Sequence, residues 1–224
     1  MKKFTILTLF PDVFENFKKF SIIKRAIANK KIKLNIIDFR QFSKNKHKKV
    51  DDYQFGGGAG MIIALPSIVA AIKKYKTKNS LVLLTSPQGK PFNQAKASTL
   101  AKTKKDFIIV CGHYEGFDAR ILNYVDEVIS MGDFVLTGGE IPAMAITEAV
   151  ARLIKGVITD SSLDFESFNN KLLDYDAYTR PVEFEGHKVP AVLLSGNHKK
   201  IAEFRKANQL AKTKKYRPDL LKSK

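Results

Sequence analysis

Residues 125–154 read VDEVISMGDFVLTGGEIPAMAITEAVARLI, so a short apolar run, a glycine-rich loop and a helical pattern follow one another directly. The run at 125–130 has the length and the β-branched content of a strand, and 141–154 has helical spacing. Glycines at 132, 138 and 139 mark the loop between them. This stretch therefore predicts one strand–loop–helix unit of an α/β sheet.

The same alternation extends towards the N-terminus. Further short apolar runs, which predict strands, lie at 4–10, 34–39, 81–85 and 107–111. Stretches with helical spacing separate them, at 11–29, 65–76, 94–102 and 118–123. Apolar strands that alternate with helices are typical of a mostly parallel sheet covered on both faces. We therefore predict an α/β fold with a parallel sheet.

Beyond residue 156 this pattern stops. Residues 157–171 are polar without a sustained period and are typical of a linker, whereas 172–195 is rich in loops. An amphipathic helix is expected from Asn197 and a short turn at 218–221. We predict an α/β domain at 1–156, an interdomain linker at 157–171 and a small basic helical domain at 172–224.

The charge of the chain is concentrated at its two ends. Lys and Arg total 39 against 22 Asp and Glu, a formal net charge of +17. Residues 1–50 carry +11 and residues 196–224 carry +8, whereas residues 51–195 carry −2. A merely lysine-biased composition would spread through the whole chain. The distribution instead indicates a polyanion partner, most plausibly nucleic acid, contacted by residues 44–49 and 199–224.

Composition excludes several other classes of protein. A hydrophobic fraction of 44% is that of a globular chain, and the single Cys111 rules out an intrachain disulfide or a multi-cysteine metal site. No apolar run approaches the ~20 residues of a membrane span, and the N-terminus lacks a cleavable signal pattern. The four histidines lack metal-ligand spacing, and His198 is interpreted as a helix-start residue. We expect a cytoplasmic protein.

Four glycine-rich or turn-rich segments stand at loop positions, at 56–60, 86–89, 111–116 and 132–140. The first is expected to precede a helix, and the other three follow predicted strands. Ligands of open α/β sheets bind beyond the carboxyl ends of the strands, so these three loops predict one small-molecule site. Their spacing matches neither of the standard nucleotide-binding loops, GxxxxGK[ST] and GxGxxG.

Several long segments, in order and spacing, resemble the bacterial tRNA (guanine-N1-)-methyltransferases of the SPOUT class; they are SPQG (86–89), CGHYEG (111–116), SMGDFVLTGGEIPAM (130–144), LLD (172–174), YTRP (178–181) and VLLSGNH (192–198). The resemblance covers nearly the whole chain. It implies a homodimer with a deep trefoil knot in each α/β domain, S-adenosylmethionine (SAM) as the methyl donor, and a tRNA anticodon stem-loop as partner. The methylated atom would be N1 of the guanosine immediately 3′ of the anticodon.

The resemblance also implies which residues bind SAM, through the three loops at 86–89, 112–116 and 130–139. The matching positions are Pro87, Gly112, Glu115, Ser130, Met131, Gly132, Asp133, Phe134, Val135, Leu136, Gly138, Gly139 and Pro142. Glycines let the backbone come close to such a ligand, and apolar side chains wall its adenine and ribose.

Guanine N1 carries a weakly acidic proton, so its methylation needs a base and a group that stabilises charge developing on O6. Glu166, in Glu166-Ser167-Phe168, stands where the family has an aspartate base, while Asp164 is the alternative and remains open. Arg152 matches the arginine assigned to O6, and Asp174 matches a second carboxylate that orients the base or the loop. Any Mg2+ would come with the RNA or through carboxylates.

The chain departs from the family pattern where Tyr53-Gln54-Phe55 replaces the usual Arg-Pro-Tyr and where His113 replaces a common arginine. Both departures concern local RNA contacts rather than the cofactor site. Two other functions compete with the SAM-dependent tRNA methyltransferase. One is a non-catalytic basic RNA-binding protein, which gives no reason for three clustered glycine loops, and the other is a related knotted methyltransferase with a different RNA target.

Overall fold

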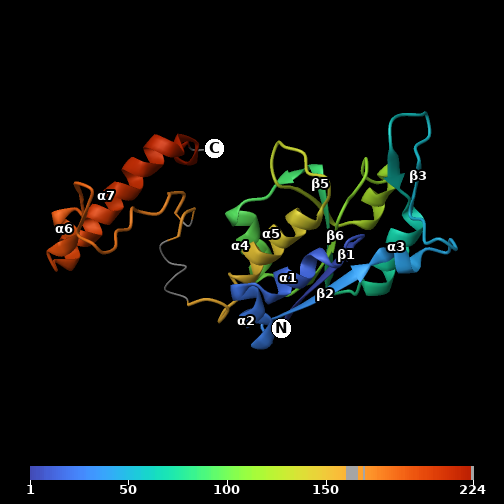
Figure 1. The fold of residues 1–224 in the computed structure, drawn as a ribbon, viewed down its shortest axis with the longest axis horizontal. Helices are drawn as coiled ribbons and strands as arrows, with labels where there is room; N and C mark the ends of the chain where they lie inside the picture. Colours follow the sequence, from blue (N-terminus) through green and yellow to red (C-terminus); the bar gives the residue numbers. More distant parts are fainter. Residues whose placement is uncertain (160–165, 169, 223–224) are drawn as a thin grey trace. The chain divides into compact units, whose positions relative to one another are not determined.

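The computed structural model describes residues 1–159, 166–168 and 170–222, which divide into two compact units, Met1–Ile158 and Thr159–Lys224. Unit 1 contains the sheet, and unit 2 contains the long helix near the C-terminus (Figure 1). Among the described helices, none combines the length and the apolar character that crossing a membrane requires.

The centre of unit 1 is a parallel sheet of five strands in the order β2-β1-β6-β5-β7. Along the chain the strands are β1 (Lys2–Thr8), β2 (Ile32–Asp38), β5 (Ser80–Pro91), β6 (Asp106–Val110) and β7 (Glu127–Ser130). Each coincides with a predicted apolar run, and the predicted α/β class with a parallel sheet is confirmed.

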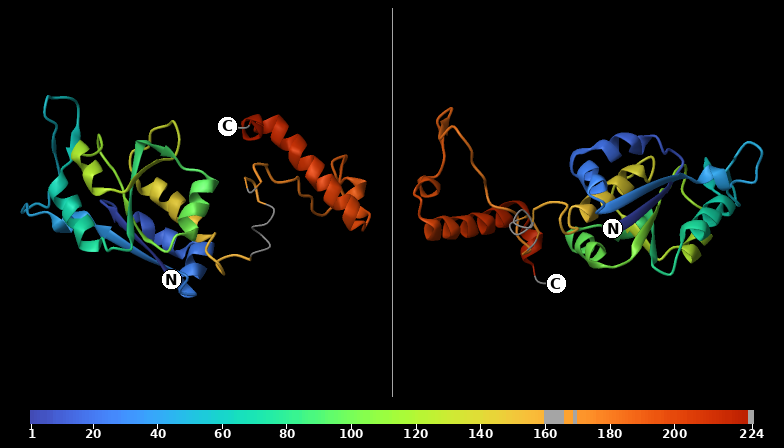
Figure 2. Two further views of the ribbon diagram at one scale, coloured as in Figure 1. Left: turned by 180° about the vertical axis from the view of Figure 1, so that it is seen from behind. Right: turned by 90° about the horizontal axis from the view of Figure 1, so that it is seen from below.

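Helices cover both faces of this sheet because the strand side chains alternate between two buried clusters (Figure 2). Along β6, Phe107 and Ile109 face one cluster, and Ile108 and Val110 face the other. The first cluster receives α1 (Val13–Lys19), α2 (Ser21–Ala28), α4 (Gln94–Lys102) and α5 (Glu140–Ala151). The second receives α3 (Leu65–Tyr75) and the 3-10 helices η1 (Phe39–Phe42) and η2 (Ala119–Tyr124).

The helical stretch expected at 11–29 is two helices rather than one. Phe20 has an extended backbone, with φ −78° and ψ 122°, so it ends α1 and caps the start of α2. The break lets Phe14 of α1 and Ile23 of α2 reach the same buried cluster. A single straight helix has its apolar stripe on one side only. Tertiary packing therefore favours two helices here, although the local helical pattern predicts one.

The glycine segment at 56–60 was expected to precede a helix, but a short strand, β4 (Met61–Ile63), lies between this segment and α3. The glycine segment forms the tip of an antiparallel hairpin between β3 (Asp51–Tyr53) and β4. The two strands are too short for a clear period-2 pattern, so sequence periodicity missed them.

Strand β5 also continues beyond its expected end at Thr85. Its pairing with β7 shifts register, because Thr85 and Lys90 both face Ile129. The intervening residues 86–89 therefore bulge out of the ladder, and the strand resumes as far as Pro91. The bulge provides a loop at the carboxyl end of the ladder.

Unit 2 consists of a two-stranded hairpin, β8 (Glu183–Phe184) and β9 (His187–Lys188), followed by α6 (Ala191–Leu194), α7 (His198–Tyr216) and the 3-10 turn η4 (Pro218–Leu221). The predicted helix start is confirmed, because the Asn197 side chain accepts a hydrogen bond from the Lys200 amide at 3.1 Å. The predicted turn at 218–221 is also confirmed.

Candidate active site

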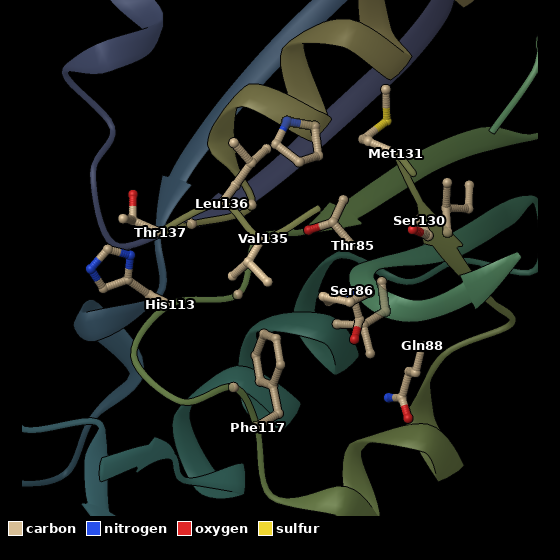
Figure 3. A pocket seen from close by; sticks show the side chains of 18 of the residues that line it. Thr85, Ser86, Gln88, His113, Phe117, Ser130, Met131, Val135, Leu136 and Thr137 are labelled. Carbon is tan, nitrogen blue, oxygen red and sulfur yellow. The ribbon is translucent and has the colours of Figure 1, made fainter. Parts of the chain in front are cut away.

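A cavity of about 290 Å3 lies at the carboxyl ends of β5, β6 and β7 (Figure 3). These three strands are neighbours in the sheet, so the loops that follow them meet although they are far apart in sequence. Twelve of the thirteen residues that the resemblance assigned to SAM line this cavity. The exception is Asp133, which is exposed and is not part of the lining. Its volume is close to the lower end of the range of small-molecule pockets.

Two glycines bring backbone into close contact behind the cavity. A Cβ on Gly139 would lie 2.6 Å from Cys111 Cα and 2.7 Å from the Gly112 amide nitrogen. On Gly112, a Cβ would lie 2.9 Å from Phe117 Cε2. The Gly139 amide donates a hydrogen bond to the Gly112 carbonyl at 2.8 Å, which joins the loop after β7 to the loop after β6. Only glycine fits this approach.

Hydrogen bonds fix the polar groups of the cavity wall. The Thr85 hydroxyl donates to the Val110 carbonyl at 3.0 Å, and Ser130 Oγ accepts from the Gly132 amide at 3.1 Å. Beneath Gly138, buried Glu140 accepts from the Thr8 hydroxyl at 2.7 Å. Because these groups are already hydrogen-bonded to one another, the conformation of the cavity wall is fixed without a ligand.

His113 brings an unsatisfied group to this wall. Its Nδ1 atom is buried and has no hydrogen-bond partner among the described residues, while its ring packs 4.8 Å from Phe10. A buried nitrogen without a partner is costly, so this atom is a candidate contact for a ligand. Figure 3 shows the ring beside Thr137 at the edge of the cavity.

The outer wall is apolar and open to solvent. Phe134, Val135 and Leu136 are exposed, with 85% of Val135 accessible, and Ile141 at the start of α5 is exposed as well. Contiguous exposed apolar side chains of this kind mark a surface that a ligand or another protein covers.

Tyr114 stands at the rim of the cavity with a perturbed phenol. Burial raises the pKa of Tyr114, and the negative charge of Asp51 raises it further, while Arg40 opposes the shift. The hydroxyl therefore stays protonated and available as a hydrogen-bond donor over the whole neutral range.

None of the three residues assigned to catalysis lines this cavity. Arg152 caps the C-terminus of α5, whose other end carries Pro142 in the cavity wall. A helix of 12 residues spans about 18 Å, so Arg152 and the cavity lie at opposite ends of α5. Glu166 and Asp174 belong to unit 2. The alternative base, Asp164, and most of the central part of the linker lie outside the described residues.

Within unit 2, a network of hydrogen bonds fastens the segment that carries Asp174 to α7. The Leu173 amide donates to Thr213 Oγ1 at 2.9 Å, and the Asp176 amide donates to Asn208 Oδ1 at 2.7 Å. The Asp174 amide donates to Ser167 Oγ at 3.0 Å, which connects this segment with the residue next to Glu166.

Glu166 lines a second cavity, of about 540 Å3, within unit 2. The opposite wall is α7, from which His198, Arg205 and Lys206 face the cavity. The guanidinium of Arg205 lies 4.6 Å from the ring centroid of Tyr175, a cation–π contact that orients it. A carboxylate and several basic groups therefore surround one hollow.

The sequence prediction missed several residues of the first cavity. Thr85, Phe117 and Gln88 line it, but the prediction did not assign them to the site. Thr85 is the last residue before a predicted loop, and that position was a usable signal. Phe117 comes within reach of the cavity only because Gly112 leaves space for its ring. Among the described residues no group of three or more His, Cys, Asp or Glu is placed to hold a metal ion.

The chain is similar to known proteins over nearly its whole length. The family described as tRNA (Guanine-1)-methyltransferase TrmD matches residues 1–223. A tRNA (guanine-N(1)-)-methyltransferase of Ureaplasma parvum is 57% identical over 218 residues, covering 97% of this chain and 96% of that protein. Proteins of the same name from Malacoplasma penetrans and Mycoplasma pneumoniae are 56% and 50% identical, each covering 95% or more of both chains.

Proposed function

Since this chain belongs to the tRNA (guanine-1)-methyltransferase family and is thereby an enzyme that methylates guanine N1 in tRNA, we propose that its unit 1 cavity binds SAM. The proposed target is the guanosine immediately 3′ of the anticodon. The observation that carries the proposal is the meeting of three glycine-containing loops in one cavity at the carboxyl ends of β5, β6 and β7.

The lining of the cavity suits SAM in its chemistry. Gly112 and Gly139 line the cavity without side chains that would fill it, and Phe117, Val135 and Leu136 supply apolar walls for a nucleoside. The unpartnered His113 Nδ1 offers one more polar contact. When bound, SAM supplies a methyl group on a positively charged sulfur. The chain contributes by holding the donor, by excluding water and by aligning the attacking nitrogen.

The remaining steps are assigned to three side chains. Glu166 accepts the N1 proton of guanine, which leaves the nitrogen lone pair free to attack the methyl carbon. Arg152 stabilises the negative charge that develops on O6 when the proton leaves. Asp174 orients the base or the loop that carries Glu166, and its connection to Ser167 supports this role.

We propose that the active enzyme is a homodimer, because one chain does not complete its own site. Arg152 lies about 18 Å along α5 from the cavity end, too far to contact a guanine held beside its own methyl donor. A second copy supplies Arg152 and Glu166 to that cavity. The exposed side chains of Phe134, Val135 and Ile141 support such an interface.

The proposed trefoil knot is supported by two close backbone approaches. A Cβ on Gly89 would lie 2.5 Å from the Ile129 amide nitrogen, so the bulge after β5 lies against β7. Gly139 lies against the backbone of Cys111 and Gly112. Both approaches lie in the segments after β5, β6 and β7 in which the knot is proposed.

We propose that unit 1 binds SAM, that unit 2 binds tRNA, and that the partner is an anticodon stem-loop. Residues 196–224 carry a net charge of +8, and α7 places His198, Arg205 and Lys206 along the second cavity. Basic side chains on one element are the electrostatic signature of phosphate contacts. Any Mg2+ is proposed to arrive with the RNA phosphates.

The test is methyl transfer from labelled SAM to two tRNA transcripts that differ only in having guanosine or adenosine 3′ of the anticodon. Incorporation into the guanosine transcript alone is the expected result. Tight SAM binding without incorporation into either transcript would favour a related methyltransferase with another RNA target. If the protein also fails to bind SAM, the remaining candidate function is that of a non-catalytic basic RNA-binding protein.

The assignment of the base and of the shared site is tested with variants. Glu166→Gln is expected to lower kcat by about 10²- to 10⁴-fold with SAM affinity unchanged, and Asp164→Asn is the matched control. A mixed dimer of Arg152→Ala with Gly139→Leu tests the shared site, since one intact composite site survives only if the partner supplies the arginine. Each variant alone is expected to be inactive, and an inactive mixed dimer would refute the shared site.

A further inference from the structure

The hairpin of β3 and β4 ends in two aromatic side chains that no part of the described chain covers. Phe55 at its tip is fully exposed (101%), the highest exposure of any large hydrophobic side chain described, and Tyr53 is 77% exposed. The tip also contains Gly56, Gly57 and Gly58, all with positive φ. We call residues 53–60 the aromatic tip.

Strand β4, which follows the aromatic tip, is joined to the cavity wall by backbone hydrogen bonds. The Ile63 amide donates to the Gly116 carbonyl at 2.8 Å, and the Glu115 amide donates to the Met61 carbonyl at 3.1 Å. Glu115 and Gly116 line the cavity proposed to bind SAM. The hairpin is therefore an extension of the rim of the candidate active site.

A basic segment precedes the hairpin directly. Residues 44–49, which we call the lysine loop, contain four lysines and His47, and all six residues are exposed. The Ser43 hydroxyl closes the loop by donating to the Lys49 carbonyl at 2.6 Å, and Lys49 Nζ lies 3.7 Å from Asp52 Oδ1 of β3. The loop and the hairpin project from the same end of unit 1 (Figure 1).

We propose that Phe55 stacks on an unpaired base of the RNA substrate while the lysine loop holds the neighbouring phosphates. An exposed aromatic ring beside basic side chains is the arrangement with which proteins bind single-stranded nucleic acid, because every base has a π-face and every nucleotide a phosphate. The inference rests on the proposed function, since it supplies a second contact for the RNA whose guanine enters the cavity.

The composition of the surface favours RNA over a protein partner. A protein interface normally has a contiguous apolar centre, whereas Phe55 and Tyr53 are flanked in sequence by glycines, by Gln54 and by the lysine loop. The three glycines have positive φ angles, which glycine adopts without strain, and they add no side chain that would cover Phe55.

The test is the affinity for an anticodon stem-loop RNA in the absence of SAM, measured by fluorescence anisotropy. Phe55→Ala is expected to weaken binding by about 5- to 150-fold, and Phe55→Tyr is expected to restore it. The matched control is Phe20→Ala, which removes another exposed phenylalanine (63%), between α1 and α2, and leaves affinity unchanged. A 2-aminopurine probe, moved through the RNA loop, identifies the base whose fluorescence Phe55 quenches.

Salt dependence separates stacking from phosphate contact. The double variant Lys46→Ala/Lys48→Ala is expected to reduce the slope of log affinity against log salt concentration, whereas Phe55→Ala leaves the slope unchanged. At saturating RNA, Phe55→Ala keeps kcat and raises KM for RNA.

The inference is overturned if Phe55→Ala binds the RNA with wild-type affinity. It is also overturned if Phe55→Ala changes the dimer mass measured by light scattering, because the tip would then belong to a contact between copies of the chain. Failure of the wild-type protein to transfer methyl groups would refute the proposed function instead. The binding assay does not depend on methyl transfer, so it still tests whether the aromatic tip contacts RNA.

Discussion

Replacement of Gly139 by alanine tests whether close backbone packing forms the cavity. The new Cβ would lie 2.6 Å from Cys111 Cα and 2.7 Å from the Gly112 amide nitrogen. Ordinary carbon–carbon contacts are about 3.5–4.0 Å, so the overlap is close to 1 Å. These two atoms belong to the backbone that follows β6 and cannot rotate aside. The Thr85 hydroxyl oxygen would lie closer still, and its hydrogen bond to the Val110 carbonyl holds it in place.

Overpacking of this kind costs about 1–3 kcal/mol. For a protein of this size each kcal/mol lowers Tm by about 2–4 °C, so Gly139→Ala is expected to melt about 2–12 °C below the wild type. The same displacement widens the cradle, and we expect SAM affinity to fall about tenfold or more. Calorimetry measures both quantities on the purified protein.

Gly138→Ala is the matched control, because its Cβ would meet only the side-chain ends of Glu140 and His113. Side chains can shift where backbone cannot, so a smaller loss of stability than for Gly139→Ala is expected. If Gly139→Ala melts within about 1 °C of the wild type and binds SAM equally well, the close packing of the two loops does not form the cavity, and the reasoning is wrong.

Three further outcomes follow from buried and paired groups. Thr8→Val removes the hydroxyl that donates to buried Glu140 and is expected to cost about 1–3 kcal/mol in urea unfolding, whereas Thr8→Ser retains most of the stability. Burial, followed by the nearby charge of Glu140, raises the pKa of Cys111, so its thiol should react with a disulfide reagent only as fast as the protein opens; rapid labelling would contradict its 1% exposure. Hydrogen bonds from Lys212 and Asn208 lower the pKa of Asp176, so its contribution to stability is present above the unfolded pKa and is lost as pH falls through the folded value; Asp176→Asn should flatten the acid side of the stability profile, and an unchanged profile would show that the pairing is not stabilising.

Much of unit 1 is predictable because its elements depend on local pattern. Apolar runs of strand length identify all five strands of the parallel sheet, and glycines identify the loops after β5, β6 and β7. The helix at 94–102 coincides with α4. In unit 2, Asn197 starts α7 because its side chain caps the first turn. These signals act within a few residues of one another.

Other features depend on residues far away in sequence. The break at Phe20 places two helices on one buried cluster, and β5 continues past Thr85 because β7 pairs with its second half. The hairpin at 51–63 is held by hydrogen bonds to Gly116 and Glu115, more than fifty residues further along. No local window contains that information.

The amino-acid pattern determined the α/β class, the basic ends and the glycine-rich loops after the strands, because periodicity, charge and turn chemistry are local properties. The family resemblance, and not these patterns, indicated which residues of the loops bind SAM. Tertiary structure alone decided which side chains line the cavity formed by the loops after β5, β6 and β7, that Arg152 lies at the far end of α5 from this cavity, and that Phe55 stands uncovered at the tip of the hairpin. The reason is physical: strand order and close backbone approach arise from packing between segments distant in sequence, which contribute stability only once the chain has folded.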